Sequence, residues 1–248
     1  MSTFVLRCGD VPVPITLASL PLSAVAAIPT EPEYDELLRT LDAAERPRLI
    51  VLGGDAALSS VLTRLMRTER LHVEIGYVPV ENSAGARIHR TGTGVVAAKR
   101  AIEGTAAELP LIRDDAGIVL VGRAVVTGPD GGCLEGEAYV DDTRLFCGKV
   151  AAVHISPTIA MPGLRAFVDR GKRFTRRRWV SGRAMQLGTT AAVVIRDGVP
   201  NPRELTRSAF YRHSEPWLLV HSVPHYAGWS ATHRTLRPTC QIVADLDT

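Results

Sequence analysis

Hydrophobic residues in the first part of the chain recur with helical and strand-like periods in turn. Leucines lie at helical spacing within Glu33–Glu45, and the continuous apolar run Leu49–Leu52 follows shortly after. The run ends at Gly53-Gly54-Asp55, beyond which apolar residues recur on one helical face up to Thr68. This order predicts a helix, a buried strand, a glycine turn and a second helix.

The next segments continue this alternation. Val73–Val80 has the composition of a strand, Glu81–Arg90 that of a polar loop, and Gly94–Glu103 that of a helix. Alternating strands and helices are typical of a mostly parallel sheet covered by helices. We therefore predict an α/β domain for residues 1–114, doubly wound and similar to nucleotide-binding domains, with the GGD turn within it.

Beyond a predicted boundary near residue 115, the pattern changes to short β-rich runs separated by turns such as Asp197-Gly198. This spacing predicts an antiparallel β-sandwich domain for residues 115–225. Residues 226–248 are predicted to form a tail that could return to the first domain. The β-rich runs are Ile118–Thr127, Leu134–Val140, Val150–Ile155, Leu164–Val168, Trp179–Leu187, Ala191–Ile195, Thr206–Arg212 and Trp217–His221.

Composition fits a globular protein, with 46% hydrophobic and 22% charged residues among 248. No apolar run is long enough to span a membrane, and the N-terminus lacks the apolar core of a signal peptide. The four cysteines are widely spaced without a CxxC pair, as expected of reduced thiols. We therefore expect a cytoplasmic protein, and the sequence predicts no metal site.

The net charge of +3 is too small to indicate nucleic-acid binding. Basic residues cluster in one run, which could contact an anionic substrate or a membrane surface peripherally, or could be a solvated strand edge kept from pairing by its charge. An exposed edge would also permit a homodimer. The basic residues of the run are Arg170, Lys172, Arg173, Arg176, Arg177 and Arg178.

The GGD turn is the feature most indicative of chemistry. Two glycines after a strand let the backbone turn tightly and approach a ligand, and a helix N-terminus presents amide donors to phosphate. Asp55 would lie at the carboxyl end of a parallel strand, where open α/β sheets bind ligands. It could orient a metal, a hydroxyl or a proton in phosphoryl transfer, or it could simply cap the helix.

This strand, turn and helix resemble the diacylglycerol kinase catalytic family, whose two-domain arrangement is shared with sphingosine kinases and NAD kinases. Gly53–Ala56 stands where that family has GGDG, and Val78–Gly85 (VPVENSAG) where it has P-x-G-T-x-N-D within a longer segment. Val193–Gly198 resembles a strand and D-G-E turn of its second domain. The resemblance implies ATP and Mg²⁺ as cofactors and Asp55 as catalytic residue. It implies nucleotide contacts at Gly53, Gly54, Asp55, Ala56, Asn82 and Ser83.

Four positions depart from the family pattern. Ala56 replaces the last glycine of GGDG, Glu81 adds a carboxylate beside the expected phosphates, and Val199 replaces the glutamate of D-G-E. Phe4–Asp10 lacks the N-P-x-S-G loop. Two hypotheses follow from these matches and departures: an ATP-dependent kinase acting on a lipid or other small hydroxyl compound in the interdomain cleft, and a catalytically degenerate relative that binds a ligand or partner. A coincidental GGD in an unrelated protein is the third.

Overall fold

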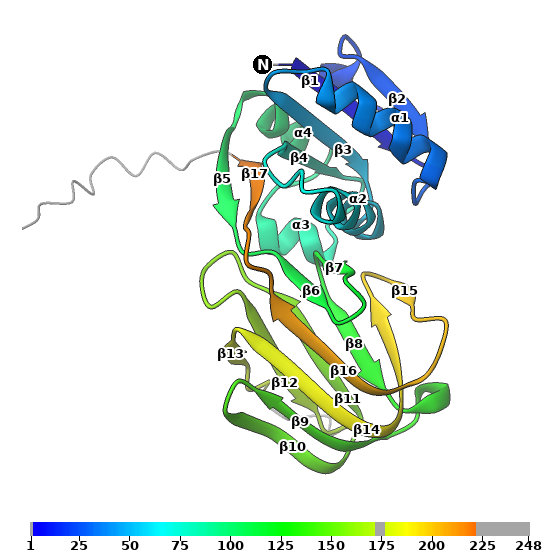
Figure 1. The fold of residues 1–248 in the computed structure, drawn as a ribbon, viewed down its shortest axis with the longest axis vertical. Helices are drawn as coiled ribbons and strands as arrows, with labels where there is room; N and C mark the ends of the chain where they lie inside the picture. The colour runs from blue at the N-terminus through cyan, green and yellow to red at the C-terminus, as the bar shows by residue number, and fades with distance from the viewer. Residues whose placement is uncertain (1, 172–176, 222–248) are drawn as a thin grey trace, which may run out of the picture.

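The computed structural model describes residues 2–171 and 177–221. Within them, two sheets lie one above the other along the long axis, and helices cover only the first (Figure 1). This arrangement confirms the predicted fold class of an α/β unit followed by an antiparallel β unit. No helix in the described ranges is long and apolar enough to cross a membrane.

The first sheet has the order β2-β1-β3-β4-β17-β5 within the described residues. Its neighbours pair in parallel except β5, which runs antiparallel to β17. The strands are β1 (Ser2–Cys8), β2 (Leu22–Val25), β3 (Pro47–Gly53), β4 (Glu74–Pro79), β5 (Thr105–Leu109) and β17 (Trp217–His221).

Helices pack on both faces of this sheet, as a doubly wound fold requires. On one face, leucines of α1 (Glu31–Asp42) and α2 (Asp55–Arg67) form a core with alternate residues of the central strands. On the other face, three alanines of α4 (Gly94–Glu103) pack against the opposite set of strand residues. Strand β3 is buried along its whole length, which explains its continuous apolar sequence.

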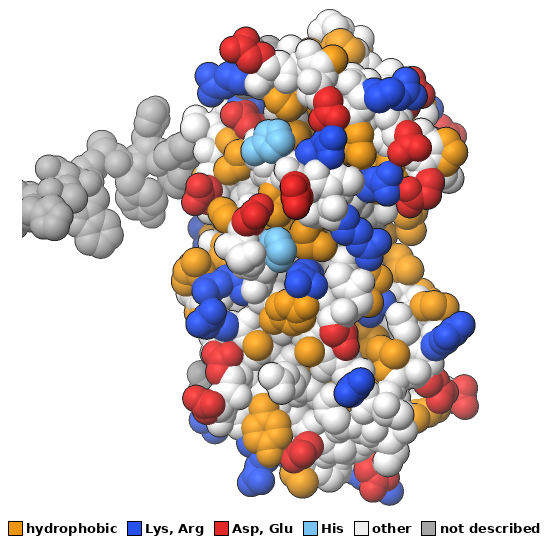
Figure 2. Space-filling model, viewed as in Figure 1, with side chains coloured by type: hydrophobic (Ala, Val, Ile, Leu, Met, Phe, Trp, Pro, Cys, Tyr) orange, Lys and Arg blue, Asp and Glu red, His pale blue; other side chains and the backbone are white. Residues whose placement is uncertain are grey.

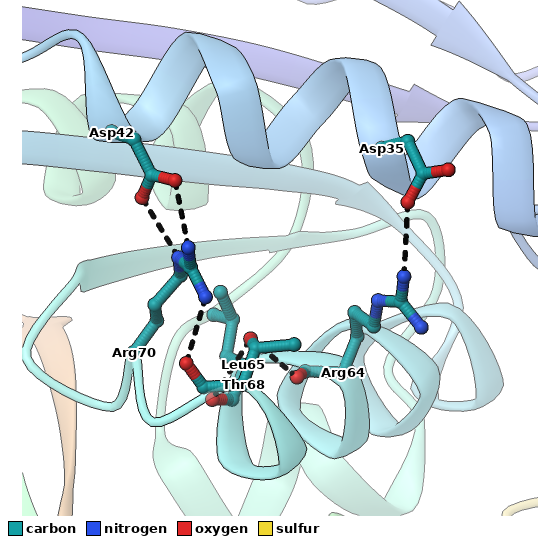
Figure 3. A network of polar contacts seen from close by, with 6 residues as sticks. All are labelled: Asp35, Asp42, Arg64, Leu65, Thr68 and Arg70. Atoms are coloured by element: carbon teal, nitrogen blue, oxygen red, sulfur yellow. Dashed lines mark hydrogen bonds and ion pairs between the residues drawn. The ribbon is translucent and has the colours of Figure 1, made fainter.

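Charged contacts hold α1 against α2 and the turn that follows it (Figure 3). Arg64 of α2 pairs with Asp35 at 3.1 Å, and Arg70 makes two hydrogen bonds to Asp42, at 2.8 and 2.7 Å. The carboxylates are largely exposed, so each pair stabilises the fold only modestly. Together they fix the position of the helix that starts at the GGD turn.

The second sheet contains eleven strands within the described residues. Its longest strand, β14 (Ala184–Arg196), pairs with β9 and β16 along its first half and with β8 and β15 along its second. The two halves enclose one apolar core. The other strands are β6 (Ile112–Asp114), β7 (Val119–Leu120), β8 (Ala124–Thr127), β9 (Leu134–Val140), β10 (Thr143–Val150), β11 (Ala152–Pro157), β12 (Leu164–Asp169), β13 (Val180–Gly182), β15 (Val199–Pro200) and β16 (Leu205–Arg212).

One local prediction was wrong, and one predicted helix is present with different bounds. The segment Glu81–Arg90, predicted as a loop, contains a short helix, α3 (Ala84–His89), which begins because the Ser83 hydroxyl accepts the Ala86 N–H at 3.1 Å. The helix predicted over Glu33–Glu45 begins earlier, at Glu31. There the Glu33 carboxylate accepts the Thr30 N–H at 2.7 Å, which stabilises the first turn.

The last described strand belongs to the first sheet. Trp217–His221, predicted among the β-rich runs of the second domain, forms β17 between β4 and β5. Three of its five residues are buried, as a central strand of a helix-covered sheet requires. The chain thus passes from the first sheet to the second after β5 and returns after β16. The boundaries at residues 114 and 225 stay a prediction, and the tail at 226–248 lies outside the described residues.

Candidate functional site at the GGD turn

The GGD turn lies at the carboxyl edge of the parallel strands. Gly53, the last residue of β3, is level with Pro79 at the end of β4, and α2 begins at Asp55. Gly54 is the N-cap of α2, with extended backbone angles and no capping side chain. It is exposed, and a Cβ atom placed on it would meet nothing within 4 Å. The space beside Gly54 is therefore open, next to the helix start whose first N–H groups have no acceptor within the helix.

The Asp55 carboxylate turns away from this space into the protein. Its Oδ1 accepts the Tyr77 hydroxyl at 2.7 Å and the Ser83 hydroxyl at 2.6 Å. Its Oδ2 accepts the Gly85 N–H at 2.9 Å. Burial, with the neighbouring Asp55 charge, raises the pKa of Tyr77 well above its usual range, so its hydroxyl stays protonated and donates. One carboxylate thus joins α2 to β4 and α3.

Asp197, in the turn between β14 and β15, resembles Asp55 in that its carboxylate also accepts three protein donors. Its Oδ1 accepts the N–H groups of Gly122 and Arg123 at 2.8 and 2.9 Å, and its Oδ2 accepts that of Val121 at 2.9 Å. These amides come from the break between β7 and β8. Burial raises the pKa of Asp197 to about 7, and the Asp55 charge adds to this while the three amides oppose it.

The two carboxylates approach each other across a glycine. A Cβ atom on Gly122 would lie 2.7 Å from Oδ2 of Asp55 and 3.0 Å from Oδ1 of Asp197. A Cβ atom on Gly85 would also collide with the Asp55 carboxylate. Six hydrogen bonds from protein donors surround the pair. The donors of Asp55 all come from the first sheet unit and those of Asp197 all come from the second, so the two carboxylates meet where the units touch.

A hollow of about 400 Å³ lies beside the start of α2, where this helix faces β15. The outline of the molecule is notched there, with hydrophobic side chains around the notch (Figure 2). Hydroxyl groups of α2 and apolar residues of the β15 region share the lining. The lining residues are Ile28, Ala56, Ser59, Ser60, Thr63, Arg67, Ile118, Arg196, Val199, Pro200, Asn201 and Pro202.

The carboxylate pair does not fit a directly bound Mg²⁺. Each carboxylate already accepts three protein donors, whereas Mg²⁺ demands free oxygen ligands in octahedral geometry. Among the described residues, no group of three or more His, Cys, Asp and Glu side chains could hold a metal.

The residues predicted as nucleotide contacts are only partly together. Ser83 hydrogen-bonds Asp55 directly, and Ala56 lies in the first turn of α2 at the edge of the hollow. Because Ala56 is helical, its position does not need glycine. The Asn82 side chain, in contrast, is exposed and makes no hydrogen bond to the described part of the chain.

The described residues of the basic run lie at the outer edge of the second sheet. Arg170 directly follows β12 and is exposed, as are Arg177 and Arg178 shortly before β13, the edge strand. The Arg177 guanidinium lies 5.5 Å from the centre of the Phe167 ring. Three predicted contacts lie outside the described residues: Lys172, Arg173 and Arg176.

Asp197, one member of the carboxylate pair, was not predicted as a site residue. Its neighbours Tyr77 and Gly122 were not predicted either. Asp197 stood out only as part of a D-G turn, and Tyr77 only as one residue of a strand. Gly122 carries no local signal, since its backbone conformation is not one that demands glycine. Its close contacts with Asp55, Gly85 and Asp197, all distant in sequence, explain it.

Comparison with solved structures identifies the fold. A diacylglycerol kinase from Bacillus anthracis strain Sterne is 11% identical, with a TM-score of 0.68 over 89% of this chain and 97% of that one. An NAD kinase from Archaeoglobus fulgidus, in complex with ATP, is 12% identical, with a TM-score of 0.55 over 90% and 94%. No protein-family model and no curated protein sequence matches. The chain therefore has the two-part fold of diacylglycerol kinases and NAD kinases.

Proposed function

We propose that this protein binds a nucleotide through its phosphates at the GGD turn. The observation that carries the proposal is the start of α2 at the carboxyl edge of the sheet, where its N-cap Gly54 is exposed with open space beside it. The solved NAD kinase with this fold is a complex with ATP. The nucleoside would lie in the hollow between α2 and β15, which offers both hydroxyl and apolar contacts.

Phosphorylation of a lipid or other small hydroxyl compound by ATP is the first candidate activity. Its support is the fold shared with a diacylglycerol kinase and the placement of Asp55 beside the turn. In this reading Asp55 positions Ser83 and the start of α3 next to the phosphates. Mg²⁺ would bind together with the nucleotide, because the two carboxylates do not offer it a complete set of oxygen ligands. The exposed Arg170, Arg177 and Arg178 would attract an anionic substrate or membrane surface.

Nucleotide binding without phosphoryl transfer is the second candidate. The hydrogen bonding of Asp55 favours it, since three protein donors already occupy most of the roughly four lone-pair sites of the carboxylate. Val199, exposed where the related motif has glutamate, also favours it.

A thermal-shift titration with ATP, ADP and NAD tests nucleotide binding, which both candidate functions require. ATP should raise the melting temperature of the wild type, because a ligand that binds only the folded state stabilises it. Gly54→Asp should abolish the shift, since its carboxylate would cap the free amides and repel phosphate. No shift with millimolar ATP in the wild type would overturn the proposal.

An acceptor-dependent assay separates the two candidates. ADP formation from ATP is followed with and without diacylglycerol in mixed micelles, and with glycerol as a small hydroxyl acceptor. Acceptor-stimulated ADP formation supports phosphoryl transfer. Binding of ATP without ADP formation supports the second candidate.

A further inference from the structure

A second cavity, of about 330 Å³, lies on the other side of the first sheet unit, at its contact with the second. It is bounded by the ends of α3 and α4, by β5 and β17, and by the loop after β11. We call it the His89 cavity. Its lining includes His89, Arg90, Arg100, Leu109, Ile159 and Leu219. None of these residues lines the hollow beside α2.

Arg100 is held in a fixed position at the rim of the cavity. Its Nη1 donates to the carbonyl oxygens of Arg90 and Thr91, both at 2.9 Å. The described residues provide no acidic partner for Arg100 or Arg90, and no acidic residue among them lines the cavity. A guanidinium that is already oriented loses little entropy when it binds an anion, so the rim is preorganised for a negative charge.

His89, which also lines the cavity, has a buried acceptor atom that no described residue uses. The ring is only 6% exposed, and its Nε2 lies 3.0 Å from the Val121 carbonyl oxygen. Because a carbonyl can only accept, Nε2 carries the proton and Nδ1 of the neutral ring carries a lone pair. Nδ1 has no hydrogen-bond partner within the described structure. Burial lowers the pKa of His89 to about 4, which keeps the ring neutral at pH 7.

The remaining lining is apolar except for His221 at the end of β17. Leu109 and Leu219 come from the two last strands of the first sheet, and Ile159 reaches the cavity from the second sheet unit. Small-molecule sites typically combine such an apolar wall with a few polar groups. We propose that the His89 cavity binds an amphipathic organic anion that carries a hydroxyl group: the charge on Arg90 and Arg100, the hydroxyl donating to His89, and the hydrocarbon part against the apolar wall.

Isothermal titration of the full chain with hexanoate and hexyl phosphate tests the anion and the apolar wall. Saturable binding of either supports the site and tells a carboxylate from a phosphate ligand. Arg90→Asn should weaken binding about tenfold, the value of one charged hydrogen bond, and asparagine tolerates the left-handed backbone of this position. Lys99→Gln, an equal charge change on the exposed side of α4, should change affinity less than about twofold.

The proposed anion site would be overturned if neither anion bound saturably, or if Arg90→Asn and Lys99→Gln lost equal affinity. Binding of 1-hexanol or of inorganic phosphate as tight as that of the two anions would also overturn it. Gly54→Asp should bind hexanoate like the wild type, so failure of the nucleotide proposal and failure of this one are distinguishable.

A comparison of the affinities for 2-hydroxyhexanoate and hexanoate tests whether His89 accepts the ligand's hydroxyl group. The hydroxyl should improve affinity about fivefold in the wild type, as a neutral hydrogen bond does. His89→Gln keeps an N–H near Nε2 for the Val121 carbonyl but has no acceptor at Nδ1, so it should lose this preference and keep hexanoate binding. An equal preference in both proteins would contradict the assignment of His89.

Discussion

Gly54 and Asp55 are neighbours in one motif and face opposite environments. Gly54 is exposed with open space around it, whereas the Asp55 carboxylate is surrounded by donors from β4 and α3. The backbone of the motif is thus free for a ligand, while its side chain connects α2 to β4 and α3 within the first sheet unit. The comparison indicates that the aspartate of this motif has a structural role that does not depend on catalysis.

The largest expected effect is that of Asp55→Ala on stability. It would leave the Tyr77 hydroxyl, the Ser83 hydroxyl and the Gly85 N–H without their acceptor, and Tyr77 is 1% exposed. Each donor left without its acceptor costs about 1–3 kcal/mol, and the partial exposure of Asp55 reduces the total. The free energy of unfolding measured in urea should therefore fall by roughly 3–5 kcal/mol. Asp10→Ala, at an exposed carboxylate 3.8 Å from Arg7, is the control and should change little. Equal effects would contradict the structural role of Asp55.

Asp197 should make stability depend on pH. Its folded pKa of about 7 exceeds the ordinary value of 3.8, so the folded state holds a proton that the unfolded state releases between these values. The free energy of unfolding should therefore fall as pH rises from about 4 to about 7, by roughly 2–4 kcal/mol given partial exposure. Urea unfolding at pH 4.5 and pH 8 measures this. In Asp197→Asn this contribution should be absent, and an unchanged pH profile would refute it.

Gly122→Ala probes the close approach of the two carboxylates. The added methyl group would press on Asp55 and Asp197, and the strain should cost roughly 1–3 kcal/mol in the same unfolding measurement. Gly188→Ala is the matched control, because a Cβ atom there meets nothing within 4 Å. A similar change in both variants would mean that the carboxylates can move apart freely.

The smallest expected effect is that of Gly54→Asp on stability. Aspartate is a good N-cap and its charge interacts favourably with the helix dipole, so α2 should gain a few tenths of a kcal/mol. Gly54→Ala, which lacks a capping group, should instead lose about 0.5–1 kcal/mol. Thermal unfolding of the pair without ligand measures the difference, and a large loss in Gly54→Asp would show that the turn is less open than described.

The sequence predicted the parts of the fold that depend on local patterns. The continuous burial of β3, the glycine turn and the apolar face of α2 are all visible in neighbouring residues. Helix α3 was missed because six residues carry too little periodicity and its start depends on one serine hydroxyl. Strand β17 was assigned to the wrong sheet because its neighbours, β4 and β5, lie more than a hundred residues away.

The same limit applies to the candidate site. Asp55 and Ser83 were both predicted as site residues, and the structure joins them by a hydrogen bond. That the carboxylate also accepts hydrogen bonds from Tyr77 and Gly85 and lies near Asp197 could not be predicted, because Tyr77 and Asp197 belong to other segments of the chain. Sequence patterns indicate which residues stand at a strand end, but the number of donors around them depends on tertiary packing.

The most direct test of the central claim compares ATP binding by Gly54→Asp and Asp55→Asn. Isothermal titration would be done at a temperature at which circular dichroism shows both variants and the wild type to be folded. If the backbone of the turn binds phosphate and the Asp55 side chain is structural, Gly54→Asp should weaken ATP binding at least about tenfold. Asp55→Asn should change it less than about threefold. Strong loss in Asp55→Asn with unchanged binding in Gly54→Asp would contradict the account.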